Sequence, residues 1–332
     1  MRDPRRRGRP SSSRRAALAL ALASASCSPY RLPPESPLTA RLPARVSDAG
    51  FYADAARGLV AADARPYAPA FSLWSDGASK RRWVRLPPGA TIDSSDMDSW
   101  QFPVGTQLWK EFWKDGRRVE TRLLMRVGEG ESAWAAVAYL WGADQSDAVA
   151  APDGAERALG TAHDVPPARA CMTCHGGRRE RVLGFSAIQL AHPAASEGEA
   201  TLDALVAEGR LSAAPARPIE VPGTPTDRAA LGYLHANCGS CHNGDRPRDA
   251  GYFRPPRGLD LWLATSDLDR VEATAAYRTT RRLVDRDDVA GSRLLHRMRR
   301  SSLFLRRMPP LATEHVDADG AAAVERWLRL RP

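Results

Sequence analysis

Two short segments each place two cysteines three positions apart, with a histidine directly after the second cysteine. They are Cys171–His175 (Cys-Met-Thr-Cys-His) and Cys238–His242 (Cys-Gly-Ser-Cys-His). Thiols at this spacing can bond to the two vinyl groups of one haem, and the following histidine can coordinate its iron. The sequence therefore predicts two covalent haem c groups, with His175 and His242 as axial iron ligands. The four haem-binding cysteines are Cys171, Cys174, Cys238 and Cys241.

Two other chemistries use paired cysteines. Zinc binds thiolates and imidazoles, but zinc ribbons usually separate their cysteine pairs by ~15–20 residues. Here the second pair begins at Cys238, far beyond that spacing from Cys174. A redox dithiol needs no histidine after its second cysteine. Haem attachment is therefore favoured over both alternatives.

The second axial ligand of each haem is less evident. Met308-Pro309-Pro310 follows the second motif; a thioether favours ferrous iron, and prolines restrict the backbone that holds it. We expect Met308 to be the far ligand of the second haem. Its weaker rivals are Met298, His296 and His315. For the first haem the site is either open or closed by one of His163, His192, His235 and Met125.

Charge and length limit the class of protein. The chain has 332 residues and a net charge of +9, but residues 1–26 contain seven Arg and one Asp, so removing them leaves +3. Two haems would add propionate carboxylates. A nucleic-acid-binding protein is therefore not expected. The length predicts two or three domains and is sufficient to enclose two haems.

The N-terminus resembles an export signal. Basic residues up to Arg15 precede an apolar run from Ala16 to Ala23, which is too short to span a bilayer. Cleavage could follow Ala25, or Cys27 could become a lipidated N-terminus that attaches the chain to a membrane. The sequence therefore predicts an exported protein, either periplasmic or a lipoprotein of the outer membrane or cell envelope.

We expect an α+β fold. We expect residues 1–27 to form the signal and residues 28–50 a linker. Residues 51–150 are expected to form a Trp-rich antiparallel β-domain, residues 151–222 the first haem-binding segment, and residues 223–332 a mainly helical, cytochrome c-like domain. Expected strands are Arg81–Leu86, Gln107–Trp113, Arg118–Val127 and Ser132–Trp141. Asp115-Gly116 predicts a tight turn between the second and third of these. In the third strand, Val119 to Val127 alternate with Glu120, Arg122 and Arg126, which predicts one buried face.

Tryptophan is concentrated in this β-domain. Seven of the nine Trp lie between Trp74 and Trp141. They could form a glycan-stacking surface, but tryptophans at strand spacing are more typical of a core. We therefore expect them to be mainly buried.

Helices are expected at Leu183–Leu190 and Thr201–Gly209, and at two sites in the last domain. Thr224-Pro225-Thr226-Asp227 has the pattern of a helix start, and that helix leads into Cys238. A closing helix is expected to begin near Asp317 or Asp319, with Trp327 packed against the helix that contains Leu231 and Tyr233.

The chain resembles a family of bacterial envelope proteins identified as di-haem c-type cytochromes. The similarity covers most of residues 51–330 in the family's order. Besides the two motifs, the matching segments are Phe71–Gly77, Phe102–Thr106, Glu120–Leu124, Tyr233–Cys238, Met308–Pro310 and the helix of Trp327. In that family the unit is sometimes joined to a quinoprotein sugar dehydrogenase domain. The resemblance therefore implies acceptance of electrons from an oxidation, here from a separate partner dehydrogenase.

Three functions are compatible with these residues. The first is an electron carrier, which we favour over an enzyme. The second is a haem peroxidase with an open first haem, but that chemistry needs an acid or base beside the iron, and the sequence does not identify one. The third is a glycan- or protein-binding module in which the haems are accessory.

Overall fold

The computed structural model describes residues 32, 36–247, 258–300, 307–310 and 313–331. The predicted signal segment and Cys27 lie outside these residues. The described chain is mixed α+β, as the sequence predicts, with antiparallel sheets and seven α-helices among the described residues. No described helix has the length and apolar content that a bilayer-spanning segment needs.

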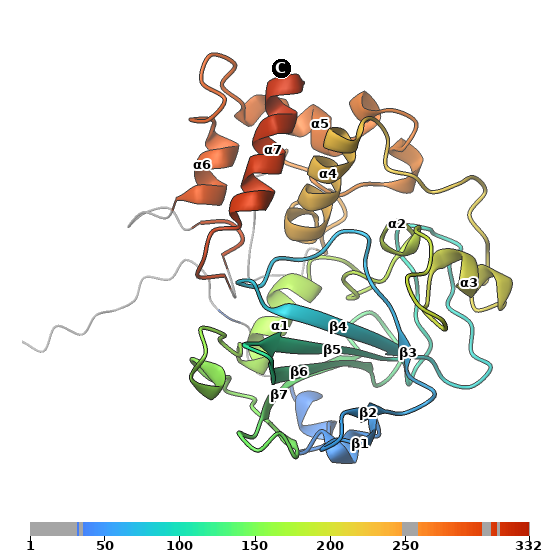
Figure 1. The fold of residues 1–332 in the computed structure, drawn as a ribbon. Helices are drawn as coiled ribbons and strands as arrows, with labels where there is room; N and C mark the ends of the chain where they lie inside the picture. Colours follow the sequence, from blue (N-terminus) through green and yellow to red (C-terminus); the bar gives the residue numbers. More distant parts are fainter. Residues whose placement is uncertain (1–31, 33–35, 248–257, 301–306, 311–312, 332) are drawn as a thin grey trace, which may run out of the picture. The chain divides into compact units, whose positions relative to one another are not determined.

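The main sheet has six antiparallel strands in the order β3-β4-β5-β6-β7-β8 (Figure 1). Each strand therefore pairs with its neighbour in sequence. The strands are β3 (Arg65–Pro66), β4 (Ser79–Arg85), β5 (Gln107–Lys114), β6 (Arg117–Arg126), β7 (Trp134–Trp141) and β8 (Ala148–Ala150). A separate pair is formed by β1 (Tyr52–Asp54) and β2 (Leu59–Val60).

The four predicted strands are confirmed as β4 to β7. The β5–β6 turn is also confirmed, because Asp115 and Gly116 both have positive φ (50° and 75°), as a type I′ turn requires. A bulge between Phe112 and Trp113 then shifts the pairing, so that Lys110 lies opposite Arg122. This extra residue decides which side chains of β5 and β6 share a face.

Both faces of the sheet are covered, so the expectation of one buried face is wrong. We call the face that carries Lys110 and Arg122 the cation face, and the opposite one, which carries Trp109 and Leu123, the aromatic face. Glu120 on the cation face is fully buried. Charged residues in a strand usually indicate a solvent-exposed face. Here Glu120 and Arg122 form an ion pair with each other, and Lys110 lines a cavity.

The aromatic face packs against the N-terminal part of the described chain. The ring of Phe51 stacks on Trp109 with centroids 4.6 Å apart. Val46, in the segment expected to be a linker, is fully buried between the short 3-10 helices η1 (Thr39–Arg41) and η2 (Ser47–Ala49). This part of the linker therefore contributes to the core, and backbone hydrogen bonds also pair it with β8, since Val46 N donates to Ala148 O at 2.9 Å and Ala44 O accepts from Ala150 N at 2.8 Å.

The tryptophans are mainly core, as predicted. Among Trp74 to Trp141, four are buried and the other three are half-buried. The buried ones are Trp100, Trp109, Trp134 and Trp141. None of these rings forms an exposed stacking platform.

The cation face packs against residues 151–222, the segment predicted to bind the first haem. Its apolar residues Leu108 and Leu124 share a core with Phe185, Leu190 and Leu205. The helices here are α1 (Ala168–His175), α2 (Ala187–Leu190) and α3 (Leu202–Ala207), with 3-10 helix η3 (Ala158–Gly160) before them.

The helices expected in this segment are found, with one shorter than predicted. The helix α3 matches the predicted one and begins at the capping residue Thr201. The helix α2 is shorter than the predicted Leu183–Leu190, because Gly184 has a positive φ of 82° and breaks the helical geometry before Ala187.

The remaining helices surround a second core (Figure 1). They are α4 (Pro225–Leu234), which continues as a π-helical turn His235–Gly239, α5 (Ala275–Thr280), α6 (Arg293–Arg299) and α7 (Ala318–Leu330). Three 3-10 helices connect them: η5 (Thr265–Asp267), η6 (Val271–Ala273) and η7 (Arg281–Leu283).

The helix starts predicted for α4 and α7 are confirmed. Thr224 and Asp227 form a capping box at the start of α4, and Asp317 caps α7. The predicted packing of Trp327 on α4 is also confirmed, since Trp327 lies in the same core as Leu231 and its Nε1 donates to Asp227 Oδ1 at 3.1 Å.

Candidate functional site

A single cavity of about 570 Å³ collects the predicted site residues. Its lining includes all four motif cysteines, His175, His242 and Met308. Pockets of ~300–1,000 Å³ are typical of small-molecule and cofactor sites. Two segments far apart in the sequence are thus brought to one place, as a pair of neighbouring cofactor sites would require.

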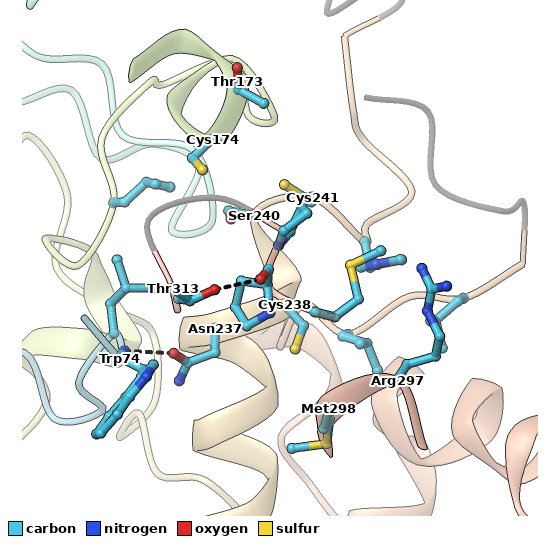
Figure 2. A pocket seen from close by; sticks show the side chains of 18 of the residues that line it. Trp74, Thr173, Cys174, Asn237, Cys238, Ser240, Cys241, Arg297, Met298 and Thr313 are labelled. Carbon is cyan, nitrogen blue, oxygen red and sulfur yellow. Dashed lines mark hydrogen bonds between the residues drawn. The ribbon is translucent and has the colours of Figure 1, made fainter. Parts of the chain in front are cut away.

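The first motif forms the end of α1, and the second begins within the π-helical turn His235–Gly239 after α4. Isolated π-turns in α-helices are frequent at functional sites. The two segments are in direct contact: Asn243 Nδ2 donates to Gly177 O at 3.2 Å, and the Cys174 and Cys241 thiols are hydrogen-bonded. Figure 2 shows Cys174 and Cys241 approaching from the two segments.

The segment between β3 and β4 fastens the second motif to the sheet. Asn237, directly before Cys238, accepts a hydrogen bond from Trp74 N at 2.7 Å (Figure 2). Its Nδ2 donates to Ser72 O at 3.2 Å. The side chain of Asn237 thus fixes the chain just where the cysteines begin.

His175 is held as an iron ligand would need to be. Its Nδ1 lies 2.6 Å from the carbonyl oxygen of Arg181, so Nδ1–H donates there and Nε2 is left for a ligand. Such a second hydrogen bond fixes the tautomer and ring orientation of metal-binding histidines. Burial lowers the pKa of His175 to about 4, which keeps the ring neutral.

The second motif also carries a neutral imidazole. Burial, aided by the charges of Arg246 and Arg297, lowers the pKa of His242 to about 4. Neutral imidazole is the form that binds a metal.

The four thiols are free rather than paired in disulfides. Burial raises the pKa of Cys171, and raises that of Cys238 to about 12. The hydrogen bond to Cys174 is the main cause that lowers the pKa of Cys241 to about 6. The four sulfurs are thus chemically different, although all line one cavity.

Met308 is the third of the predicted iron ligands. It lines the cavity, and its backbone N–H donates to the carbonyl oxygen of Arg297 at 2.8 Å, which ties it to α6. Met298 of α6 lines the same cavity, although it is only 6% exposed and belongs to the helical core. The other two rivals, His296 and His315, do not contribute to this lining.

None of the four candidates for the far side of the first haem lines this cavity. His163 bonds Glu120, and both ring nitrogens of His192 lie within hydrogen-bond distance of backbone carbonyls. His235 accepts from Leu263 N at 3.1 Å, and Met125 packs on the aromatic face. The described structure does not bring these residues together with the first motif's histidine.

The sequence analysis did not predict that the cavity is positively charged. Five cationic side chains line it, and no carboxylate among the described residues does. The cations are Lys110, Arg122, Arg282, Arg293 and Arg297. The buried hydroxyl of Thr173 also lines it and has no hydrogen-bond partner. These groups fit a haem, whose ring is apolar and whose propionates are anions.

Behind Arg122 lies a buried charged group. The guanidinium of Arg122 binds Glu120, with Nη2 2.9 Å from Oε2, and His163 Nε2 lies 2.7 Å from the same carboxylate. Burial would raise the pKa of Glu120, but Arg122 and His163 hold it below its ordinary value. The two residues that bind Glu120 are 41 positions apart in sequence, so the strand pattern alone could not predict this triad.

The described residues include no group of three or more His, Cys, Asp or Glu side chains placed to hold a metal ion. A structural zinc site needs four such ligands. A haem iron differs, because the porphyrin supplies four ligands and the protein only one or two.

Comparison of the chain with protein-family models, with curated proteins and with solved structures found no match.

Proposed function

We propose that this chain is an exported di-haem c-type cytochrome that carries electrons. The main observation in support is that both Cys-x-x-Cys-His motifs, 63 residues apart, line one largely apolar cavity together with Met308. Bound haem would supply reversible one-electron oxidation and reduction of iron. The residues Cys171, Cys174, Cys238 and Cys241 would hold the two haems, and His175, His242 and Met308 would be axial ligands.

The surroundings of the motifs support this proposal. His175 is neutral and oriented by the Arg181 carbonyl, and the cavity is cationic where propionates need partners. Direct contact between the motifs, through Asn243 and Gly177, would bring the two haems close together. Closely spaced redox centres suit electron transfer within the chain.

The direction of electron flow and the location of the protein are part of the same proposal. Electrons would enter from a partner dehydrogenase, for which a quinoprotein is a candidate because of the family resemblance. Covalent haem attachment takes place outside the bacterial cytoplasmic membrane, which fits an N-terminal export signal, with lipidated Cys27 as an optional membrane anchor.

The test is a count of covalent haems. The chain is expressed with its N-terminus in a host that matures c-type cytochromes, and the product is analysed by haem-stained denaturing gel and intact mass. Two covalent haems are expected, and one in a variant with both cysteines of either motif changed to alanine. A colourless mature protein, or one that contains zinc, contradicts the proposal.

A haem peroxidase is the second candidate. The observation that favours it is the buried Glu120–Arg122–His163 triad, whose Arg122 lines the cavity beside the first motif. Peroxide chemistry needs a positioned acid, base or cation at an open iron. Rapid spectral change on addition of peroxide or cyanide, at one haem only, would support this candidate over the pure carrier.

A further inference from the structure

Three cations stand side by side on the cation face of the sheet. Arg82 of β4 lies directly opposite Lys110 of β5, and Lys110 lies directly opposite Arg122 of β6. Like charges in directly opposite positions destabilise a sheet. Lys80, two positions before Arg82, adds a fourth positive charge to the same face. An arrangement of this kind favours the binding of an anion.

Only one of the three has a counter-ion in the described chain. Arg122 binds Glu120. The Arg82 side chain is only 8% exposed, yet among the described residues it makes no hydrogen bond or ion pair. Lys110 is half-buried, and its side chain also makes no hydrogen bond or ion pair among the described residues. Its ammonium lies 5.6 Å from the centre of the Phe112 ring. A buried charge without a partner is costly.

A small cavity lies at these two side chains. It has a volume of about 40 Å³, and Arg82, Lys110 and Trp262 contribute to its lining. The Nε1–H of Trp262 is buried and has no acceptor. Three side chains that carry donors therefore line a space that exceeds the ~10–15 Å³ needed for one water.

Two of the acceptors around this small cavity are already in use. Gln189 Oε1 accepts from Phe71 N at 2.9 Å, and His235 Nδ1 accepts from Leu263 N at 3.1 Å. No carboxylate of the described chain lines it. A lining that carries two cationic side chains and no carboxylate fits an anion better than a cation.

The small cavity adjoins the large one. Lys110 lines both, as do Leu73, Leu183 and Ser240. Burial and the neighbouring charges of Arg82, Arg122 and Lys80 lower the pKa of Lys110 well below its ordinary value. A negative charge next to Lys110 would remove part of that electrostatic cost.

We propose that Arg82, Lys110 and Trp262 bind a carboxylate group in this small cavity. The carboxylate has two possible sources. One is a propionate of the haem at the first motif, in which case the inference rests on the proposed function. The other is a free small carboxylate that enters through the large cavity. Arg122, held by Glu120, adds positive potential from the next strand.

The experiment compares four variants of the full-length, matured protein. Lys110→Met removes one charge, and Trp262→Phe removes one N–H donor while keeping a large ring. Lys114→Met, at the end of the same strand, and Trp100→Phe, whose buried Nε1 is also without an acceptor, are the matched controls. The intact mass of each variant first gives its haem content.

Two measurements then separate the two sources. For a propionate, the resonance Raman propionate band of one haem shifts in Lys110→Met and Trp262→Phe. The reduction potential of that haem also falls in Lys110→Met, since a nearby positive charge is lost. For a free carboxylate, acetate at constant ionic strength raises the Tm of the wild-type protein, and its apparent Kd is at least tenfold weaker in Lys110→Met.

Either response, absent in both controls, supports the carboxylate site. If neither measurement distinguishes Lys110→Met and Trp262→Phe from the controls, the proposal is overturned. It is also overturned if Lys110→Met converts one iron from low to high spin, because Lys110 would then be an iron ligand. If Lys110→Met does not fold, Trp262→Phe, which keeps every charge, decides the question.

The carboxylate site can be tested even if the proposed function is wrong. If the wild-type mass gives no covalent haem, the cytochrome proposal fails, whereas the acetate titration of the same colourless protein still tests the small cavity. A lack of any acetate effect in that protein overturns the carboxylate site as well.

Discussion

Gly177 lies directly against Ser240, so the turn after the first Cys-x-x-Cys-His motif touches the middle of the second. A Cβ atom at Gly177 would overlap the carbonyl oxygen of Ser240. Its own N–H donates to Cys174 O at 3.1 Å, which closes the end of α1. Only glycine allows the two motif backbones to approach this closely.

Replacement of Gly177 by alanine should separate the motifs. Overpacking of a close contact costs about 1–3 kcal/mol. We expect a lower free energy of unfolding, measured by urea denaturation of the matured protein, with both haems still attached. Gly128→Ala is the control, because a Cβ there meets Ala133 at an ordinary 3.5 Å. Equal stability of the two variants would refute the close contact.

A pair of substitutions at residues that line the cavity can identify the axial ligand of the proposed second haem. Met308→Leu should lower the reduction potential of one haem and remove its methionine-to-iron absorption, because a thioether ligand favours ferrous iron. Met298→Leu should change stability by less than ~1.5 kcal/mol, as a volume-conserving core substitution does, and leave the spectrum unchanged. The reverse result would assign the ligand to Met298.

The charged end of α4 should make stability depend on pH. Burial raises the pKa of Asp227, but its hydrogen bonds with Arg331 and Thr224 dominate and lower it to about 2. Because the folded pKa lies below the ordinary 3.8, the stabilisation is complete above about pH 5 and is lost as the pH falls through about 2.

Asp227→Asn tests this dependence. It should cost about 2 kcal/mol at pH 7, since it weakens the charge-assisted hydrogen bonds from Arg331 and Trp327. The difference from wild type should shrink as the pH falls from 5 to 2, measured by urea denaturation at each pH. Asp153→Asn, at an exposed loop position, should match wild type throughout. A pH-independent difference would show that the carboxylate charge is not responsible.

Local signals in the sequence were sufficient to predict several elements. The Thr224 capping box, the Asp115-Gly116 turn and the periodicity of α7 each depend on residues within a few positions of one another. The short strands β1, β2, β3 and β8 could not be predicted, since two or three residues carry no periodicity.

The row of cations shows why register limits prediction. From the two-residue turn, Lys114 pairs with Arg117, and simple counting would then place Lys110 opposite Thr121. The bulge at Phe112 and Trp113 adds one residue and brings Lys110 opposite Arg122 instead. A shift of one residue exchanges the faces of a strand. The residue types at this bulge do not indicate it. The sequence therefore did not predict that Lys110 lies opposite Arg122, or that an anion could bind there.

The buried triad on β6 gives the last prediction. Glu120 is fully buried and holds both Arg122 and His163. Glu120→Gln leaves the Arg122 charge without its counter-ion, and loss of one partner of a buried ion pair costs about 3–5 kcal/mol. The uncompensated charge beside the first motif should also raise the reduction potential of one haem. Glu129→Gln is the control, because Glu129 is 88% exposed and its ion pair with Arg126 is long, at 3.6 Å. If Glu120→Gln and Glu129→Gln unfold at the same urea concentration and share the same potentials, the triad neither stabilises the sheet nor sets the charge beside Cys171.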